Sequence, residues 1–242
     1  MARCAIVAFV LVLLCIASLP AAAQVTYTTI DVPGAVVTVV QGINSAGDLV
    51  GYYANAEPGV THGFLFRNGV FTSIDYPGAD STSASGINDS GLIVGSALKG
   101  TEEVGFTYDG TKFTAIRVHR QSATTIWGIN NTSVVVGGDG TLSATRGYAL
   151  RDHHLKVISP PGSFVVAYAT GVNDFGEIVG FVSSGGDGRG FLYRHGGYKT
   201  IVVPGALQTE LWASTTMGRL WGGIRSGPPS AVSPFKPDGS LP

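Results

Sequence analysis

The strongest constraint on the fold of this chain is an internal repeat of 42 to 44 residues. A Gly-Ile-Asn tripeptide begins at Gly42, Gly86 and Gly128. A Gly-Val-Asn variant follows at Gly171, so that the three spacings are 44, 42 and 43 residues. An apolar residue followed by glycine, a glycine followed by an aromatic residue, and a Pro-Gly pair keep the same phase in most copies. Such a period is typical of folds that repeat one supersecondary unit.

Each repeat has the pattern of four short strands separated by turns. In the second repeat, the Asn-Asp-Ser-Gly sequence at 88–91 and the Asp-Gly pair at 109–110 are turn signals between apolar and β-branched segments. No stretch after the N-terminal leader has a helical apolar period over 11 or more residues. The strands expected in this repeat are 82–87, 92–98, 104–108 and 112–118. Four-stranded units of this length predict an all-β protein with a β-propeller fold.

The two ends of the chain complement each other. At this period the residues that follow the leader hold about five repeats, and the last repeat, from about 213 to 242, lacks a fourth strand. Residues 27–34 (Tyr-Thr-Thr-Ile-Asp-Val-Pro-Gly) match the fourth strand at 71–78 (Phe-Thr-Ser-Ile-Asp-Tyr-Pro-Gly). We therefore expect five four-stranded blades closed by the N-terminal strand, which would protect the edge strands. An open β-solenoid and a β-sandwich remain the alternatives.

The first 23 residues have the pattern of a secretory signal peptide. Arg3 precedes an apolar run at 5–19, Pro20 ends the run, and three alanines provide a cleavage site before Gln24. The run is shorter than the roughly 20 residues that a membrane span needs, although an uncleaved anchor is the alternative. We expect a signal peptide at 1–23, one propeller domain at 24–242, and a secreted or periplasmic protein without a membrane partner after cleavage.

Cysteine content and charge exclude several classes of protein. Both cysteines, Cys4 and Cys15, lie inside the predicted signal peptide, so the mature chain would have no disulfide and no thiolate metal site. Charged residues make up 13% of the chain and the net charge is −1. This balance argues against a nucleic-acid partner, which would need a basic surface. We expect a monomer.

The strand before each Gly-Ile-Asn motif carries the candidate binding site. Alternate residues of a strand share one face. One face is apolar in every repeat and is expected to pack between blades: Val40, Ala84, Ile126, Ala169 and Leu211. The other face varies, and five of its residues are expected to form a pocket near a central channel: Gln41, Trp127, Tyr168, Glu210 and Trp212. Aromatic rings beside a few polar groups suit a sugar or another small ligand, although the same residues could merely fill the channel.

The case for catalysis rests on few acidic residues. A glycan-acting hydrolase would need two convergent carboxylates, and Glu210 with Asp80 is the available pair. Two other acidic pairs, Asp31 with Asp75 and Asp89 with Asp174, recur at equivalent repeat positions, which predicts structural roles. The five histidines occupy positions without metal-ligand spacing: His62, His119, His153, His154 and His195. We therefore expect no catalytic residue, no metal and no cofactor.

The repeat resembles that of the bacterial extracellular HAF-repeat proteins. The resemblance rests on the segment Gly-Ile-Asn-Ser-Ala-Gly-Asp-Leu-Val-Gly at 42–51, on His62-Gly63-Phe64, and on Thr-Ser-Ile-Asp-Tyr-Pro-Gly-Ala at 72–79. The third repeat has Thr-Ser where a glycine is usual, and the fifth repeat lacks the asparagine. The resemblance implies a secreted bacterial repeat protein whose family has no known activity. We expect a non-catalytic binding or structural scaffold for a glycan or an extracellular protein.

Overall fold

The computed structural model describes residues 27–118, 123–141, 144–184, 187–214, 220–225 and 231–235. The predicted signal peptide lies outside the described residues. The chain divides into two compact units, Met1–Ile30 and Asp31–Pro242, and the architecture below is that of the second unit. All nineteen elements assigned within the described residues are β-strands, which confirms the all-β prediction. In the same part of the chain we find no helix with the length and apolar character to cross a membrane.

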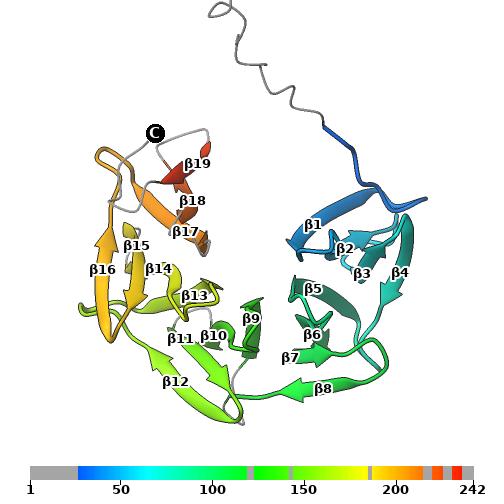
Figure 1. The fold of residues 1–242 in the computed structure, drawn as a ribbon, viewed down its shortest axis with the longest axis horizontal. Helices are drawn as coiled ribbons and strands as arrows, with labels where there is room; N and C mark the ends of the chain where they lie inside the picture. The colour runs from blue at the N-terminus through cyan, green and yellow to red at the C-terminus, as the bar shows by residue number, and fades with distance from the viewer. Residues whose placement is uncertain are drawn as a thin grey trace, which may run out of the picture. The chain divides into compact units, whose positions relative to one another are not determined.

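The strands follow one another as five repeats of an antiparallel meander, which we number in chain order (Figure 1). Repeat 1 contains β1 (Val37–Ile43), β2 (Leu49–Ala54), β3 (His62–Arg67) and β4 (Val70–Ile74). Repeat 2 contains β5 (Ser81–Ile87), β6 (Ile93–Lys99), β7 (Glu102–Tyr108) and β8 (Phe113–Ile116). Repeat 3 contains β9 (Ala123–Ile129), β10 (Val135–Thr141), β11 (Ala144–Arg151) and β12 (His154–Ile158). Repeat 4 contains β13 (Val166–Val172), β14 (Ile178–Ser184), β15 (Asp187–Arg194) and β16 (Gly197–Ile201). The described strands of repeat 5 are β17 (Gln208–Ser214), β18 (Leu220–Arg225) and β19 (Ala231–Phe235).

The four strands expected in repeat 2 are confirmed to within two residues at each end. The last is shorter than expected at both ends, since we expected residues 112–118 and β8 spans Phe113–Ile116. The turn before it is longer than a two-residue hairpin because the carboxylate of Asp109 accepts hydrogen bonds from the backbone N–H groups of Thr111 and Lys112, at 2.9 and 2.8 Å. Such side-chain bonds offer the backbone an alternative to strand pairing.

The first strand of every repeat contains a β-bulge. Its pairing with the second strand skips one residue, directly before the glycine of the Gly-Ile-Asn motif or its equivalent. The skipped residues are Gln41, Ser85, Trp127, Thr170 and Trp212. A bulge leaves its residue out of the ladder and turns the side chain in a new direction.

The bulge explains why the second strand always has a glycine opposite it. A Cβ atom added to Gly51 would lie 1.9 Å from the carbonyl oxygen of Val39, and one added to Gly180 would lie 1.9 Å from that of Tyr168. Equivalent additions to the three remaining glycines, Gly95, Gly137 and Gly222, would meet a backbone oxygen at 1.9 to 2.1 Å. A side chain cannot fit at such a separation, so this recurring glycine is a steric requirement of the fold.

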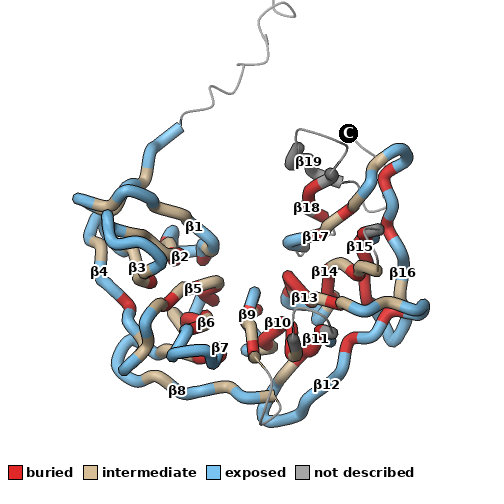
Figure 2. Tube along the Cα trace, turned by 180° about the vertical axis from the view of Figure 1, so that it is seen from behind, coloured by how far each residue is buried: buried red, intermediate tan, exposed pale blue. Residues whose placement is uncertain are grey.

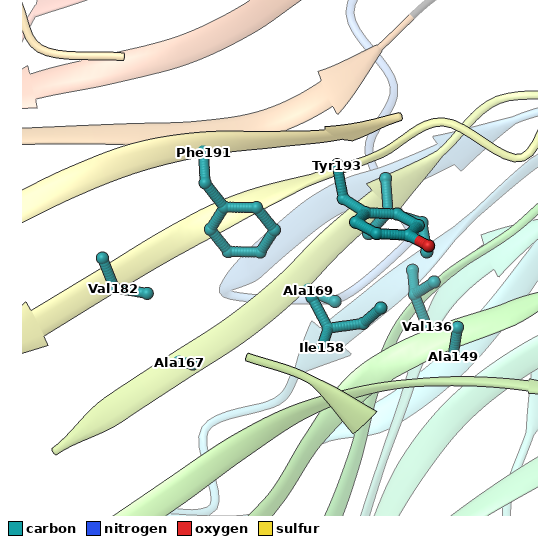
Figure 3. Close-up of a cluster of buried hydrophobic side chains, with 9 residues drawn as sticks. Val136, Ala149, Ile158, Ala167, Ala169, Val182, Phe191 and Tyr193 are labelled. Carbon is teal, nitrogen blue, oxygen red and sulfur yellow. The ribbon is translucent and has the colours of Figure 1, made fainter. Parts of the chain in front are cut away.

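The hydrophobic core is divided among the junctions between consecutive repeats. Between repeats 1 and 2, Val50 and Ile74 pack against Ala84 and Ile93. The equivalent junction between repeats 3 and 4 includes Ile158 and Ala169 with two aromatic side chains, as Figure 3 shows. Each repeat therefore depends on its neighbour for burial of its apolar face, as in other repeat folds.

The apolar face predicted from the first strands is buried in four of the five repeats. Ala84, Ile126, Ala169 and Leu211 are all 0% exposed, which confirms the prediction for these positions. Val40, the equivalent residue of repeat 1, is instead 42% exposed. The burial patterns show the same contrast, since β1 has no buried residue whereas β13 has four. Figure 2 colours the two strands accordingly. The prediction is therefore not met at Val40, which is exposed.

The asparagine of each motif joins neighbouring repeats as well as forming its own turn. The side-chain amide of Asn44 donates to the carbonyl oxygen of Asn88 at 3.4 Å, and Asn88 donates to that of Asn130 at 3.3 Å. Asn130 in turn donates to the carbonyl oxygen of Asn173 at 2.8 Å. The Oδ1 atoms meanwhile accept backbone N–H groups four residues later, as from Val134 to Asn130 at 2.8 Å. The predicted turn role is confirmed, and the contact between repeats adds to it.

The completion of repeat 5 by the N-terminal strand is not seen in the described residues. Within these residues β19 pairs with β18 alone, and residues 27–32 form no strand. The structure thus contains four four-stranded repeats and three strands of a fifth.

Candidate functional site

The five bulged residues line one cavity of about 270 Å³. They come from the first strands of all five repeats, so the cavity is built by residues about 43 positions apart in sequence. The glycines that follow them let these strands approach closely, since a Cβ added to Gly42 would lie 3.0 Å from the Cα of Gly86. Three of the five predicted site residues are in the wall of this cavity: Gln41, Trp127 and Trp212.

Two tryptophans give the cavity its aromatic surface. Trp127 is 40% exposed and Trp212 is 44% exposed, although large aromatic side chains are usually buried in a core. The predicted site residue Tyr168 does not line the cavity, but its ring meets the ring of Trp127 edge to face at a centroid distance of 6.4 Å. Tyr168 also lies over Gly138, where an added Cβ would be 2.5 Å from the ring. Tyr168 therefore supports Trp127 from behind rather than facing a ligand.

Glu210 holds the second tryptophan. Its carboxylate Oε2 accepts a hydrogen bond from the indole Nε1 of Trp212 at 3.2 Å. The indole ring also covers Gly223, because an added Cβ there would lie 2.9 Å from it. Glu210 is not part of the cavity wall. Its hydrogen bond instead orients the indole ring of Trp212.

The polar groups of the cavity differ in whether a hydrogen-bonding atom is left for a ligand. The hydroxyl of Ser83 donates to the side-chain oxygen of Gln41 at 2.7 Å, which leaves the amide NH₂ of Gln41 as a donor. The hydroxyl of Thr170 donates to the carbonyl oxygen of Leu211, and this side chain is buried. Gln41, which is exposed, is therefore the better hydrogen-bonding group for a ligand.

Ser85 and Thr170 belong to the cavity but were absent from the predicted site. The sequence prediction chose aromatic, charged and amide side chains from both variable positions of each first strand. The signal that identifies the full set is simpler: each member directly precedes the glycine of the motif or the equivalent residue. The bulge makes this one position face the cavity in every repeat.

A second, smaller cavity of about 200 Å³ shares four apolar residues with the first: Ile43, Ile87, Ile129 and Val172. Its polar wall is held together by hydrogen bonds between repeats. The N–H of Ser45 donates to Asp89 at 2.8 Å, and the N–H of Asn131 donates to Asp174 at 2.8 Å. The bond from Ser45 lowers the pKa of the Asp89 carboxyl. These carboxylates are structural, as predicted, and in the described part of the chain no three acidic or histidine side chains gather as a metal site.

The two carboxylates considered for hydrolysis have separate local partners. Asp80 Oδ2 accepts a hydrogen bond from the N–H of Gly100 at 2.7 Å, in the turn between β6 and β7. Glu210 is bonded to Trp212 as described above. Neither residue lines the cavity of the bulged residues.

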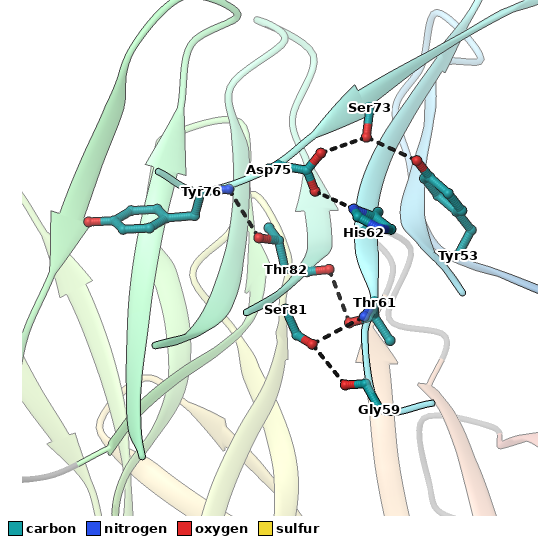
Figure 4. A network of polar contacts seen from close by, with 9 residues as sticks. All are labelled: Tyr53, Gly59, Thr61, His62, Ser73, Asp75, Tyr76, Ser81 and Thr82. Carbon is teal, nitrogen blue, oxygen red and sulfur yellow. Dashed lines mark hydrogen bonds and ion pairs between the residues drawn. The ribbon is translucent and has the colours of Figure 1, made fainter. Parts of the chain in front are cut away.

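His62 belongs to a polar network on the outer part of repeat 1 (Figure 4). Its Nδ1 lies 2.9 Å from Oδ1 of Asp75, and its ring stacks on Tyr53 at 5.1 Å. The hydroxyl of Ser73 donates to the other oxygen of Asp75 at 2.9 Å. The serine is thus bonded to the carboxylate and not to the imidazole, so the three residues do not form a nucleophile with a base.

Comparison with solved structures identifies the class of fold. The β-propeller domain of the Trilobed protease from Pyrococcus furiosus, which has an open velcro topology, matches with a TM-score of 0.55 at 15% identity, over 85% of this chain and 68% of that one. Dipeptidyl peptidase 4 of Porphyromonas gingivalis matches with a TM-score of 0.54 at 11% identity, over 84% of this chain and 36% of that one. Virginiamycin B lyase of Staphylococcus aureus has a TM-score of 0.48 at 8% identity, over 81% and 69% of the two chains.

The first two likenesses, with the repeated antiparallel sheets, show a β-propeller fold. At such low identity they show the fold alone, because one propeller scaffold carries many functions. No family model matches the sequence, and none of the curated proteins matches it.

Proposed function

We propose that this protein is a non-catalytic glycan-binding propeller of the HAF-repeat type, exported from a bacterial cell, and that its cavity of bulged residues is the binding site. It acts as a monomer outside the cytoplasm. The support is one observation: five equivalent bulges direct their side chains to one cavity, and two of these side chains are exposed tryptophans. An exposed indole beside an amide donor can stack on a sugar ring and bond its hydroxyls.

The partners of the two candidate carboxylates support a binding role more than a catalytic one. The carboxylate of Glu210 is bonded to the indole of Trp212, and Asp80 is bonded to a turn. A glycosidase needs two carboxyl groups roughly 5 to 10 Å apart across the scissile bond. Among the described residues that line the cavity, none carries a carboxylate.

A glycan array followed by calorimetry tests this function. The wild-type protein should bind at least one glycan, and Trp127→Ala and Trp212→Ala should each weaken binding by about tenfold or more, as expected when an aromatic contact is lost. Phe175→Ala is the matched control, since Phe175 is 75% exposed and outside the cavity. Equal binding by the wild type and both tryptophan variants would contradict the proposal, as would hydrolysis of the bound glycan. If the protein binds an extracellular protein and no glycan, the cavity is a binding site for a protein ligand instead.

We also propose that the propeller has five blades and that residues 27–30 form the fourth strand of repeat 5. The argument is the equivalence of Ile30 with the last residue of each fourth strand, and Ile74, Ile158 and Ile201 at this position are at most 2% exposed. Closure would place Ile30 in a fifth junction and cover the exposed Val40. Deletion of residues 24–36 should then lower the melting temperature sharply. An unchanged melting temperature would favour a propeller without this closure.

A further inference from the structure

A hollow of about 440 Å³ lies between repeats 2 and 3, away from the cavity of bulged residues. Ile116 and Val118 of repeat 2 form one apolar wall, and Val135, Leu150 and Leu155 of repeat 3 form the other. Threonine, serine and charged residues also line it. Its volume is in the range of small-ligand sites, roughly 300 to 1,000 Å³.

Two sister junctions, between repeats 1 and 2 and between repeats 3 and 4, are filled by pairs of aromatic rings. Each pair comes from residues directly opposite each other on the third and fourth strands. Tyr108 and Phe113 stack at a centroid distance of 4.4 Å in the junction between repeats 1 and 2. Tyr193 and Tyr198 lie 4.9 Å apart in the junction between repeats 3 and 4. Aromatic pairs of this kind supply large buried areas in cores.

Repeat 3 has leucines at these two positions. Leu150 and Leu155 are cross-strand partners in the same register as the aromatic pairs, and Leu155 is 40% exposed. The wall from repeat 2 is also reduced, because Val118 stands where repeat 1 has Tyr76, whose ring lies 5.3 Å from that of Phe113. The hollow is therefore the space that aromatic rings fill in the sister junctions.

The opposite wall shows the same lack of packing. Ile116 is only half-buried, whereas its equivalents Ile74 and Ile158 are 2% and 0% exposed. The hollow opens to solvent, and its apolar walls lack the rings that cover the equivalent surface in the two sister junctions. Apolar walls of this kind gain dispersion contacts when a ring enters from outside the chain.

We propose that this hollow binds the tyrosine or phenylalanine side chain of a peptide segment from a partner protein. The apolar walls take the ring as the sister junctions take their own tyrosine and phenylalanine rings. The exposed polar residues of the lining, which include Arg117, Asp152 and His153, can bond the hydroxyl of a bound tyrosine and the peptide groups on either side of it. This site is independent of the glycan-binding proposal.

Titration with short peptides tests the proposal. The methyl resonances of Leu150 and Leu155 should shift on addition of acetyl-Gly-Tyr-Gly-amide and should respond about tenfold more weakly to acetyl-Gly-Leu-Gly-amide, as expected if the ring supplies the contact. The methyls of Leu98, which is exposed and outside the hollow, should not move. Unshifted methyls, or equal binding of both peptides, would overturn the proposal.

Exchange of the pairs between junctions provides the variants. In Leu150→Tyr/Leu155→Phe the hollow should be filled as in repeat 2, so that peptide binding is lost while the melting temperature stays the same or rises. Undiminished binding by this folded variant would also overturn the proposal. Val118→Tyr is the second variant, for use if the double substitution fails to fold. It places a ring on the other wall, as Tyr76 does in repeat 1, and it should likewise abolish binding. The reciprocal Tyr108→Leu/Phe113→Leu should open a hollow between repeats 1 and 2 and add a second peptide site.

Discussion

The side-chain amide of Asn130 donates a hydrogen bond to the carbonyl oxygen of Asn173, 43 residues further along the chain, at 2.8 Å. Both residues are buried, and the same contact joins Asn44 to Asn88 and Asn88 to Asn130. The asparagines thus connect four consecutive repeats through their side chains. The asparagine that recurs in the turn of each repeat therefore also forms a hydrogen bond between neighbouring repeats.

Asn130→Asp should remove the hydrogen bond between repeats while keeping the hydrogen bond of the turn. An aspartate keeps the oxygen that accepts the N–H of Val134 but cannot donate to the carbonyl of Asn173 when it is ionised. Loss of a buried donor should lower the free energy of unfolding by about 1 to 3 kcal/mol, measured by urea denaturation. The exposed Asn55→Asp is the control, with an expected change within about 0.5 kcal/mol. Equal effects of the two substitutions would mean that the contact contributes nothing measurable.

Gly180→Ala should be among the most damaging single substitutions in this fold. Its Cβ would lie 1.9 Å from the carbonyl oxygen of Tyr168, so the bulge of β13 would have to move. We expect a loss of about 3 kcal/mol or more in chemical denaturation. Gly197→Ala is the matched control, because its added Cβ would meet an atom at 3.7 Å, an ordinary contact. A tolerated Gly180→Ala would show that the bulge is not required.

Acid should destabilise the protein through Asp48. Its hydrogen bonds from Arg67 and Asn44, both at 2.9 Å, lower the pKa of the Asp48 carboxyl below its usual value near 3.8. The folded state therefore binds this proton less readily than the unfolded state, so the stabilisation is present above pH 4 and is lost as the pH falls through the lowered pKa. Asp48→Asn should reduce stability at pH 7 and flatten the decline toward pH 2. A parallel decline in wild type and variant would contradict this, with the exposed Glu57→Gln as control.

Ile30→Ala tests whether the N-terminal segment is packed. If Ile30 is buried like Ile74 and Ile201, its truncation should cost about 2 to 5 kcal/mol in denaturant unfolding. Ile43→Ala is the matched control, since Ile43 is 66% exposed and its truncation should cost well under 1 kcal/mol. Similar small losses for both variants would argue that residues 27–30 are not part of a blade.

The repeat and its strands were predictable because their signals are local. Each turn is formed within a few residues, as when Asn88 Oδ1 accepts the N–H of Leu92. The apolar face of the first strand was also predictable from alternation, apart from Val40, whose burial depends on what packs against repeat 1. The β-bulge was not predicted, because it is a property of two paired strands and changes which residue faces the cavity. For this reason Tyr168 and Glu210 were expected in the cavity wall and instead support Trp127 and Trp212.

The hollow between repeats 2 and 3 could not be predicted from the sequence for a different reason. In the sequence, Leu150 and Leu155 are ordinary apolar residues of two strands. Only the cross-strand register pairs these two leucines with each other and shows that they are equivalent to Tyr108 and Phe113. A missing ring is visible only when the filled and unfilled junctions are compared.

Closure of the propeller is the central claim, and a double-cysteine variant tests it most directly. In repeat 1, Phe64 pairs with Ser73, and the equivalent residues of repeat 5 are Ser233 and Thr29. Cross-strand partners have Cβ atoms roughly 4.5 to 5.5 Å apart, near enough for a disulfide to form with small adjustment. Thr29→Cys/Ser233→Cys, made in residues 24–242, which contain no native cysteine, should form an intramolecular disulfide under mild oxidation and raise the melting temperature. Free thiols after oxidation, or disulfide-linked dimers alone, would contradict closure by the chain's own N-terminal strand.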